Sequence, residues 1–265
     1  MKRLYSAPMS NTPRYAIYYA AAQASDLDRF GAQLLGYDAF GCHDLPFPAD
    51  VLQAAPDWRE LTADPRKYGF HATLKAPFTL APDKTEAELL AACSAFAATP
   101  RTIPVITPVV GSISGFIAVI PAEPPSELIQ LAADCVTDFD SFRAPLTEAD
   151  RARRNPSRLT PAQREHLDRW GYPYVMDDFR FHMTLTGRLG SARREGVLAM
   201  LQARFSKLDL ATLAIDRIAV FRQESAASRF RIVGEWELCG ADAGNVTRGG
   251  VIAEQQIESR KHPKK

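Results

Sequence analysis

The chain has 265 residues, of which 46% are hydrophobic and 24% are charged, and this composition is that of a globular protein rather than a fibrous or disordered one. Its 32 basic and 31 acidic side chains leave a net charge of +1, so no overall field exists that would hold a long polyanion. Extended nucleic acid is therefore not an expected partner, and an anionic substrate should be small or bound locally.

The first half of the chain alternates strand and helix signals. Residues 15–20 predict a β-strand, and Ser25 then begins an amphipathic helix that ends at Gly36. The stretch 41–68 is rich in proline, aspartate and tryptophan, which predicts an irregular connection with one helical turn. The elements predicted after it are a strand at 70–74, a helix over 85–98, and strands over 103–110 and 115–120 separated by Gly111 and Ser112.

The second half repeats this order of elements in a degenerate form. We predict helices over 125–139 and 191–206, a strand at 181–185, and a hairpin of 215–222 with 230–238 across the loop 223–228. Between the helix at 125–139 and the strand at 181–185 lies a basic connection at 142–157. It is followed by a helix that Thr160 and Pro161 begin and Gly171 ends. The order indicates one bilobal domain at 14–239, with an N-terminal extension at 1–13 and a mobile tail at 240–265.

The cysteines and the apolar runs predict a compartment. No Cys-x-x-Cys pair occurs, which argues against a zinc knuckle and a disulfide scaffold and favours reduced, mostly buried thiols. Residues 1–13 lack the apolar stretch of a secretory signal, and no apolar run reaches the roughly 18 to 20 residues that span a bilayer. We therefore expect a cytoplasmic protein that does not bind a membrane. No feature of the sequence indicates a particular protein partner. The four cysteines are Cys42, Cys93, Cys135 and Cys239.

One short phrase occurs twice, at residues 70–74 and 181–185. Two of the five histidines, His71 and His182, share a phenylalanine before them, a threonine two residues after and a leucine three residues after. In a strand, alternate side chains share a face, so His71, Thr73 and Lys75 should point one way and the apolar residues the other. The polar face of the second strand should carry Arg180, His182, Thr184, Thr186 and Arg188.

Two such polar faces suit a phosphate. Threonine hydroxyls can donate to its non-bridging oxygens, while Lys75 and Arg188 offset its charge. One neutral histidine can then take a proton from water while the other, protonated, donates to the leaving oxygen. This division of labour needs no metal, no cofactor and no covalent nucleophile, and His-x-Thr lacks the second nearby ligand of common zinc motifs. The alternative is that the two histidines only fill the core.

Four further features suggest additional substrate contacts, each with a structural alternative. Tyr68 precedes the first histidine and could stack on a base, with core packing as the alternative. Thr186 and Arg180 are candidates for additional substrate contacts, and Arg180 could instead pair with the neighbouring aspartates at 177–178. The basic run 151–154 is typical of a solvated loop, although it lies where a second substrate phosphate could be bound.

The segments 67–78 and 169–189, which contain the two phrases, resemble the two-histidine (2H) phosphoesterase superfamily. They are most similar to its bacterial branch associated with phosphonate-degradation operons, and the resemblance covers roughly residues 14–238. It implies an α+β, bilobal, pseudo-twofold fold. Each lobe would be a mainly antiparallel sheet with helices on its outer face, and a cleft would lie between the lobes. His71 and His182 would be the acid and base, and Thr73 and Thr184 the phosphate binders.

The resemblance also implies an activity, that of a metal-independent cyclic phosphodiesterase acting on a small cyclic phosphate. For the phosphonate branch, the candidate substrate is phosphoribosyl 1,2-cyclic phosphate. The segment 142–174 is an insertion relative to the smallest members, which puts the RNA substrates of better-known relatives in doubt here. Two alternatives remain open: a 2′,3′-cyclic phosphodiesterase or 2′–5′ ligase acting on RNA ends, and a module that binds a nucleotide without turning it over.

Overall fold

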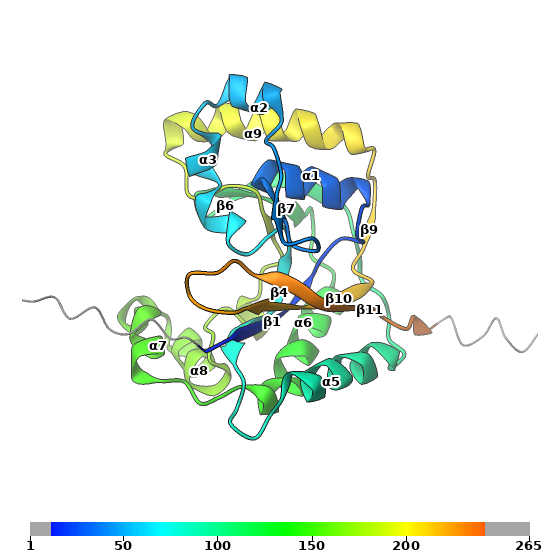
Figure 1. Ribbon diagram of the computed structural model, residues 1–265, viewed down its shortest axis with the longest axis vertical. Coiled ribbons are helices and arrows are strands. Elements are labelled where there is room, and N and C mark those ends of the chain that lie inside the picture. The colour runs from blue at the N-terminus through cyan, green and yellow to red at the C-terminus, as the bar shows by residue number, and fades with distance from the viewer. Residues whose placement is uncertain (1–11, 242–265) are drawn as a thin grey trace, which may run out of the picture.

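The computed structural model of the protein describes residues 12–241. Most of the predicted N-terminal extension at 1–13 and of the predicted tail at 240–265 lies outside the described residues. Between them, strands and helices combine in an α+β fold with a large antiparallel sheet, as expected (Figure 1).

The main sheet of residues 12–241 has seven strands in the order β11-β10-β1-β4-β8-β7-β6, and every neighbouring pair in it is antiparallel. Its strands are β1 (Arg14–Tyr19), β4 (Ala72–Thr79), β6 (Pro108–Ile113), β7 (Phe116–Pro121), β8 (Met183–Thr184), β10 (Arg217–Gln223) and β11 (Arg231–Glu237). Two short pairs stand apart from it: β2 (Tyr37–Asp38) with β3 (His43–Asp44), and β5 (Val105–Ile106) with β9 (Leu213–Ala214).

The sheet consists of two equivalent halves. One half contains β10, β1 and β4, with β11 as an additional edge strand, and the other contains β6, β7 and β8. A single residue pair, Ala72 with Met183, joins β4 to β8 within the described chain. The main-sheet strands that come after each histidine strand join the other half, because β7 pairs with β8 and β10 pairs with β1. The structure thus agrees with the pseudo-twofold fold, but the two expected sheets are fused into one.

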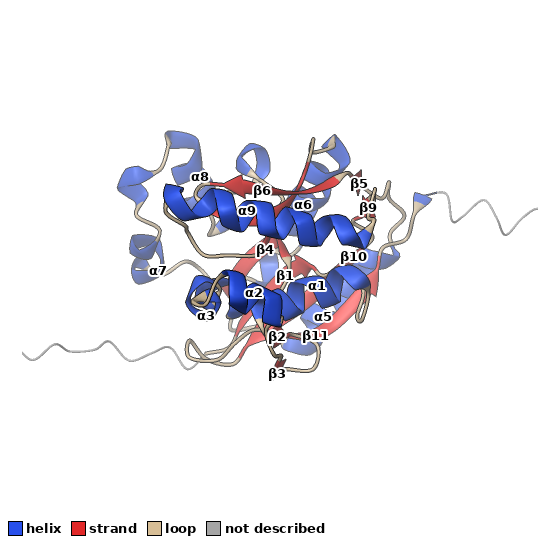
Figure 2. Ribbon diagram, turned by 90° about the horizontal axis from the view of Figure 1, so that it is seen from above, coloured by secondary structure: helices blue, strands red, loops and turns tan. Residues whose placement is uncertain are grey.

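Helices lie on both sides of the strands. Helix α5 packs on β10 and β11, α6 packs on β4, and α9 packs on β6 and β7. Helix α1 lies beside α9, with Phe30 contacting Phe205 and Phe70 (Figure 2). These helices are α1 (Asp26–Leu35), α5 (Glu86–Ala98), α6 (Ser126–Asp138) and α9 (Ser191–Phe205).

The predicted helix ends are confirmed, because each depends on a local hydrogen bond. Ser25 accepts from the backbone N–H of Asp28 at the start of α1, and Gly36 ends that helix in the left-handed region. Thr85 and Thr160 form capping boxes at the starts of α5 and of α8 (Pro161–Trp170), and Gly171 ends α8.

Three local predictions are wrong. The stretch 41–68 contains three short helices, and Trp58 in the second of them is fully buried and donates from Nε1 to the Leu34 carbonyl at 2.7 Å. The basic connection contains one more helix, which Thr147 caps. The β6–β7 turn lies at Ser114 and Gly115, where φ is positive, rather than at Gly111 and Ser112. The four helices are α2 (Ala49–Ala54), α3 (Trp58–Leu61), α4 (Ala63–Arg66) and α7 (Glu148–Arg153).

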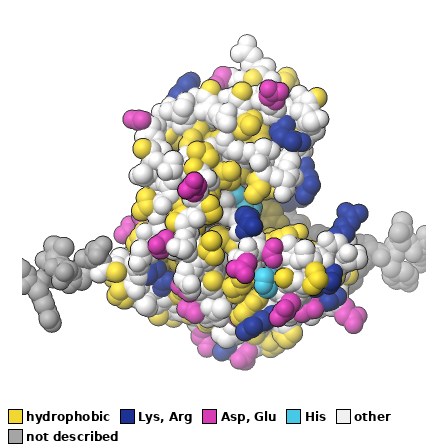
Figure 3. All heavy atoms as spheres, turned by 180° about the vertical axis from the view of Figure 1, so that it is seen from behind, with side chains coloured by type: hydrophobic (Ala, Val, Ile, Leu, Met, Phe, Trp, Pro, Cys, Tyr) yellow, Lys and Arg dark blue, Asp and Glu magenta, His cyan; other side chains and the backbone are white. Residues whose placement is uncertain are grey.

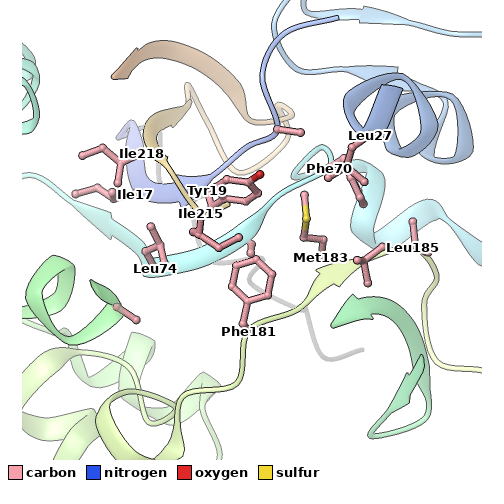
Figure 4. Packing of buried hydrophobic residues seen from close by; sticks show 14 of the residues in the cluster. Ile17, Tyr19, Leu27, Phe70, Leu74, Phe181, Met183, Leu185, Ile215 and Ile218 are labelled. Atoms are coloured by element: carbon pink, nitrogen blue, oxygen red, sulfur yellow. The ribbon is translucent and has the colours of Figure 1, made fainter. Parts of the chain in front are cut away.

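The apolar residues of both repeated phrases face one core, as predicted. Phe70, Ala72 and Leu74 share a buried cluster with Phe181, Met183 and Leu185 (Figure 4). Because one face of each strand is buried in this way, the other face is free to carry polar groups. No helix in the described part of the chain is both long and apolar enough to cross a membrane.

Candidate active site

The two histidine strands meet, and their register brings four predicted residues together. Because Ala72 lies opposite Met183, carrying the register one residue to either side sets His71 opposite Thr184 and Thr73 opposite His182. Opposed residues in an antiparallel pair share a face, as do alternate residues in a strand, so all four side chains lie on the same face. One face of the molecule has a central hollow in which a histidine lies beside a basic side chain (Figure 3).

Both imidazoles are held by the same hydrogen bond. His71 bonds through Nδ1 to the carbonyl oxygen of Gly69 at 2.9 Å, and His182 bonds through Nδ1 to the carbonyl oxygen of Arg180 at 2.6 Å. Because a carbonyl oxygen only accepts, each Nδ1 carries the hydrogen, and a neutral ring keeps its lone pair on Nε2. Thr73 Oγ1 lies 3.4 Å from Nε2 of His71, within reach of the atom that would exchange a proton.

The carbonyl that holds His71 depends on a glycine. Gly69 has a φ of +77°, and a Cβ built there would lie 2.8 Å from the Cβ of Ala39. A side chain at this position would therefore be strained and crowded. The sequence pattern Gly-Phe-His thus sets the direction of the carbonyl that selects the tautomer of His71.

His71 lies in an aromatic box. Its ring stacks on Tyr18 with centroids 3.9 Å apart and planes at 22°, and Tyr68 and Phe221 lie 6.0 and 5.8 Å away. Burial is the main cause that lowers the pKa of His71 to about 4; the bond to the Gly69 carbonyl opposes this shift, and the charge of His182 adds to it. The ring is therefore neutral at pH 7.

His182 has a less aromatic environment, with Phe116 at 5.4 Å. Burial lowers its pKa as well, and the hydrogen bond to the Arg180 carbonyl opposes this shift. Since the charge of His182 acts on His71, the two imidazoles belong to one electrostatic site. Within residues 12–241, no group of three His, Cys, Asp or Glu side chains is placed to hold a metal ion.

Lys75 does not share the face of His71, contrary to the prediction. Thr73 pairs with Tyr18 of β1 but Lys75 pairs with Ile17, the next residue, so a bulge between the two pairs turns Lys75 to the opposite face. There its ammonium donates to the Val136 carbonyl at 2.8 Å and lies 3.3 Å from Asp140, and the residue is 3% exposed. Lys75 is thus a buried ion-pair residue beneath α6.

The remaining candidates are dispersed. Thr186 is fully buried and is wrong as a substrate contact, because its hydroxyl accepts from the Ile117 N–H and donates to the Gly187 carbonyl. Arg180 is exposed and donates to the carbonyls of Asp177 and Phe179 instead of to an aspartate side chain. Arg188 is exposed. Tyr68 stacks on Phe230 at 5.2 Å while also facing His71.

Tyr18 is the site residue that the sequence did not reveal. Its neighbours Ala16 and Ala20 share its face, so β1 presents small residues on either side of one large ring. This small-large-small pattern is visible in the sequence, but it points to His71 only once β1 is known to pair with β4.

A family model described as "Protein of unknown function (DUF1045)" matches residues 73–231 of this chain. Ribose 1,5-bisphosphate phosphokinase PhnN of Janthinobacterium sp. (strain Marseille) is 36% identical over 232 residues, or 84% of this chain and 50% of the relative. The protein of the same name from Laribacter hongkongensis (strain HLHK9) is 31% identical over 221 residues, or 83% of this chain and 50% of the relative. The chain thus spans about half the length of the curated relatives it matches.

Solved structures similar to this chain share little sequence with it. A conserved protein of unknown function, ATU0111 of Agrobacterium tumefaciens str. C58, is 14% identical with a TM-score of 0.41, covering 91% of this chain and 93% of that one. E. coli LigT complexed with NADP+ is 16% identical with a TM-score of 0.36, covering 86% of this chain and 98% of that one.

Proposed function

Because the chain belongs to the DUF1045 family, whose description leaves the activity open, we propose a function from the site itself: a metal-independent cyclic phosphodiesterase of the 2H type. The observation that carries the proposal is the matched pair of imidazoles. Each is fixed through Nδ1 to the carbonyl two residues before it, on adjacent strands, with Nε2 left for proton transfer.

The reaction is hydrolysis of one P–O bond in a cyclic phosphate. Nε2 of one neutral histidine takes a proton from water as the water oxygen bonds to phosphorus. The second histidine, protonated on Nε2, gives its proton to the sugar oxygen as the P–O bond breaks. Thr73 and Thr184 donate from their hydroxyls to non-bridging oxygens, where negative charge grows.

The environments of the two histidines support one division of these roles. Burial against Tyr18 holds the pKa of His71 at about 4, which keeps it neutral and suits the base. His182 is the acid, because its pKa is lowered without the added effect of a second imidazole charge. A bound phosphate anion would raise the pKa of His182 and favour its protonated form.

The names of the relatives support a ribose cyclic phosphate as substrate. Hydrolysis of 5-phosphoribosyl 1,2-cyclic phosphate at the P–O2 bond leaves one phosphate on C1 and one on C5, which is the ribose 1,5-bisphosphate in those names. The phosphate-binding motif G-x-x-x-x-G-K-[ST], common in phosphokinases, does not occur in these 265 residues. We therefore assign to this chain, in the cytoplasm, the step that produces that bisphosphate.

Phosphorus NMR on a small panel of substrates tests the proposal. We expect the protein to open 5-phosphoribosyl 1,2-cyclic phosphate to ribose 1,5-bisphosphate, at a rate that EDTA leaves unchanged. Cleavage of the P–O1 bond, which would leave the phosphate on C2 instead of C1, would overturn the regiochemistry. Turnover of 2′,3′-cyclic nucleotides alone would favour the RNA-end activity, and tight binding without product would favour a nucleotide-binding module.

A further inference from the structure

The insertion at 142–174 contains a helix, α8, that is fixed to the strand of the first histidine. The carbonyl oxygen of Arg169, in the last turn of α8, accepts from the Arg143 guanidinium at 3.0 Å. Arg143 also pairs with Asp140, and the same carboxylate lies 3.3 Å from the Lys75 ammonium of β4. A chain of polar contacts therefore anchors α8 to the main sheet.

Two side chains of α8 face one carboxylate that follows the insertion. Nε2 of Gln163 donates to Oδ1 of Asp178 at 2.9 Å, and Nδ1 of His166 lies 3.5 Å from Oδ2 of the same residue. Gln163 and His166 are three residues apart, so they share one side of the helix. Oε1 of Gln163 accepts from the Thr160 N–H in the capping box, which fixes the orientation of its amide. Both oxygens of Asp178 are thus directed at an anchored helix.

Asp178 ends a tight turn whose backbone is strained. Residues Met176–Asp178 form a short 3-10 helix, in which the Asp178 N–H donates to the Val175 carbonyl and the Phe179 N–H donates to the Met176 carbonyl, both at 3.0 Å. Met176 has a φ of +53°, in the left-handed region that is costly for a residue with a side chain. Such a conformation persists only where surrounding contacts impose it, and the contacts of Asp178 with α8 are of this kind.

The turn leads directly to the carbonyl that orients His182. The Arg180 guanidinium folds back on the turn and donates to the carbonyl oxygens of Asp177 and Phe179, at 2.9 and 2.7 Å. The carbonyl oxygen of Arg180 itself accepts from Nδ1 of His182 at 2.6 Å. The direction of this carbonyl therefore depends on a segment that Arg180 closes from within and that α8 holds from outside at Asp178.

The matching carbonyl of the first histidine is fixed by other means. Gly69, two residues before His71, has a φ of +77°, and a Cβ there would lie 2.8 Å from the Cβ of Ala39. The residue two positions before His182 is Arg180, which has a side chain and follows the strained turn. The two halves of the site thus reach the same hydrogen bond differently, one through a glycine and the other through a contact with the insertion.

We propose that Asp178, held by Gln163 and His166, is a positioning residue that fixes the Arg180 carbonyl and so keeps the Nδ1–H tautomer of His182. The insertion then acts on proton transfer without touching the substrate, because Nε2 of His182 stays free to exchange the proton. This inference rests on the proposed function for the role of His182 as the acid, whereas the hydrogen bonds themselves do not depend on the substrate.

Exchanging the hydrogen-bonding groups of Gln163 and Asp178 tests the proposal. Gln163→Glu keeps an acceptor for the Thr160 N–H but replaces the amide donor with a carboxylate that faces Asp178. We expect kcat to fall about 10-fold with little change in KM, because loss of a hydrogen bond to a charged group shifts a local equilibrium by at least about that factor. Adding Asp178→Asn restores a hydrogen bond with donor and acceptor exchanged, and kcat should return toward the wild-type value.

Helix α6 offers a matched control. There Nε2 of Gln130 donates to Oδ1 of Asp134 at 2.7 Å, so Gln130→Glu makes the same change beside an aspartate in an exposed pair. We expect this variant to have wild-type kcat and KM. A fall in kcat equal to that of Gln163→Glu would show a general effect of added charge and would overturn the positioning role.

Nitrogen NMR of the imidazoles in the free protein, at about pH 8, separates this inference from the proposed function. We expect the Nδ1–H signal of His182 to weaken in Gln163→Glu and to return in the exchanged pair, while His71 keeps its own signal because Gly69 sets it. This result would support the positioning role even if no cyclic phosphate were hydrolysed, and the function alone would then fail. An unchanged His182 signal, or one that the exchanged pair does not restore, would overturn the positioning role and leave the function standing.

Discussion

His71 and His182 are diagonal neighbours across the pair of Ala72 and Met183, and each donates from Nδ1 to the backbone carbonyl two residues before it. The two imidazoles therefore present the same atom, Nε2, from adjacent strands. Their surroundings differ, because His71 stacks on Tyr18 whereas His182 lies 5.4 Å from Phe116. The two histidines thus make equivalent hydrogen bonds but have different aromatic neighbours, and a base and an acid in one site need such a difference in environment.

Removing either imidazole should abolish most of the activity. We expect His71→Ala and His182→Ala each to lower kcat by about 10² to 10⁴, or about 3 to 5 kcal/mol of barrier. The double variant should be little slower than the slower single one, because the two act as a unit. Steady-state rates on the preferred cyclic phosphate check this, with the exposed His43→Ala as control. Wild-type turnover in either single variant would remove both histidines from the mechanism.

The pH dependence should reflect a neutral base and a protonated acid. The pKa of His71 is about 4 and that of His182 is below its ordinary 6.5. The active state, in which His71 is neutral and His182 is protonated, is therefore most populated at acidic pH. We expect kcat/KM to rise as the pH falls from 8 toward 5 and to decline as it approaches 4. Imidazole NMR should show the pKa of His71 rising in His182→Ala, because the positive charge of His182 is gone. A kcat/KM that falls steadily below pH 7 would contradict the assignment.

Lys75 should affect stability and not phosphate binding. We expect Lys75→Met to keep kcat/KM close to wild type, because the ammonium lies on the α6 side of β4. Burial lowers the pKa of Lys75 from 10.5 to about 8, so between these values the unfolded chain binds more protons and stability rises with pH. Urea unfolding at pH 7.5 and 10 should show that rise, up to about 3 kcal/mol, in the wild type only. A large loss of substrate affinity in the variant would restore Lys75 to the site.

Thr184 and Thr186 should behave differently although both follow His182 in the same strand phrase. Thr186→Val leaves the Ile117 N–H and the Gly187 carbonyl without their partner, which should cost about 1 to 3 kcal/mol of unfolding free energy and leave the rate of the folded enzyme unchanged. Thr184→Val should leave stability near wild type and lower kcat/KM about 10- to 100-fold through a lost bond to the phosphate. Thermal unfolding and kinetics on both variants decide this, and the reverse pattern would exchange their roles.

Much of the fold could be predicted because its signals are local. Ser25, Thr85 and Thr160 begin helices through hydrogen bonds to residues three positions later, and Gly36 and Gly171 end helices in the left-handed region. These contacts need only a few neighbouring residues, so composition and spacing reveal them. The helices α2, α3 and α4 were missed because burial, such as that of Trp58 against Leu34, stabilises turns whose own period is too short to detect.

The candidate site also combines features that the sequence of one strand shows with features that depend on its partner strand. The period of two along a strand correctly separated His71 and Thr73 from Phe70 and Leu74. It failed at Lys75, because a bulge against β1 between Thr73 and Lys75 shifts the register by one residue and turns Lys75 to the opposite face. A bulge depends on the partner strand, and the sequence of β4 alone does not record it.

By itself, the sequence determined which groups carry the proposed chemistry: two His-x-Thr phrases whose alternation buries one face and frees the other. Only the tertiary structure decided that Ala72 pairs with Met183, which brings the two phrases onto one face, and that Tyr18 stacks on His71 while Lys75 turns away. The physical reason is range, because alternation is set by the geometry of single residues, whereas pairing, bulges and burial depend on residues more than fifty or a hundred positions apart.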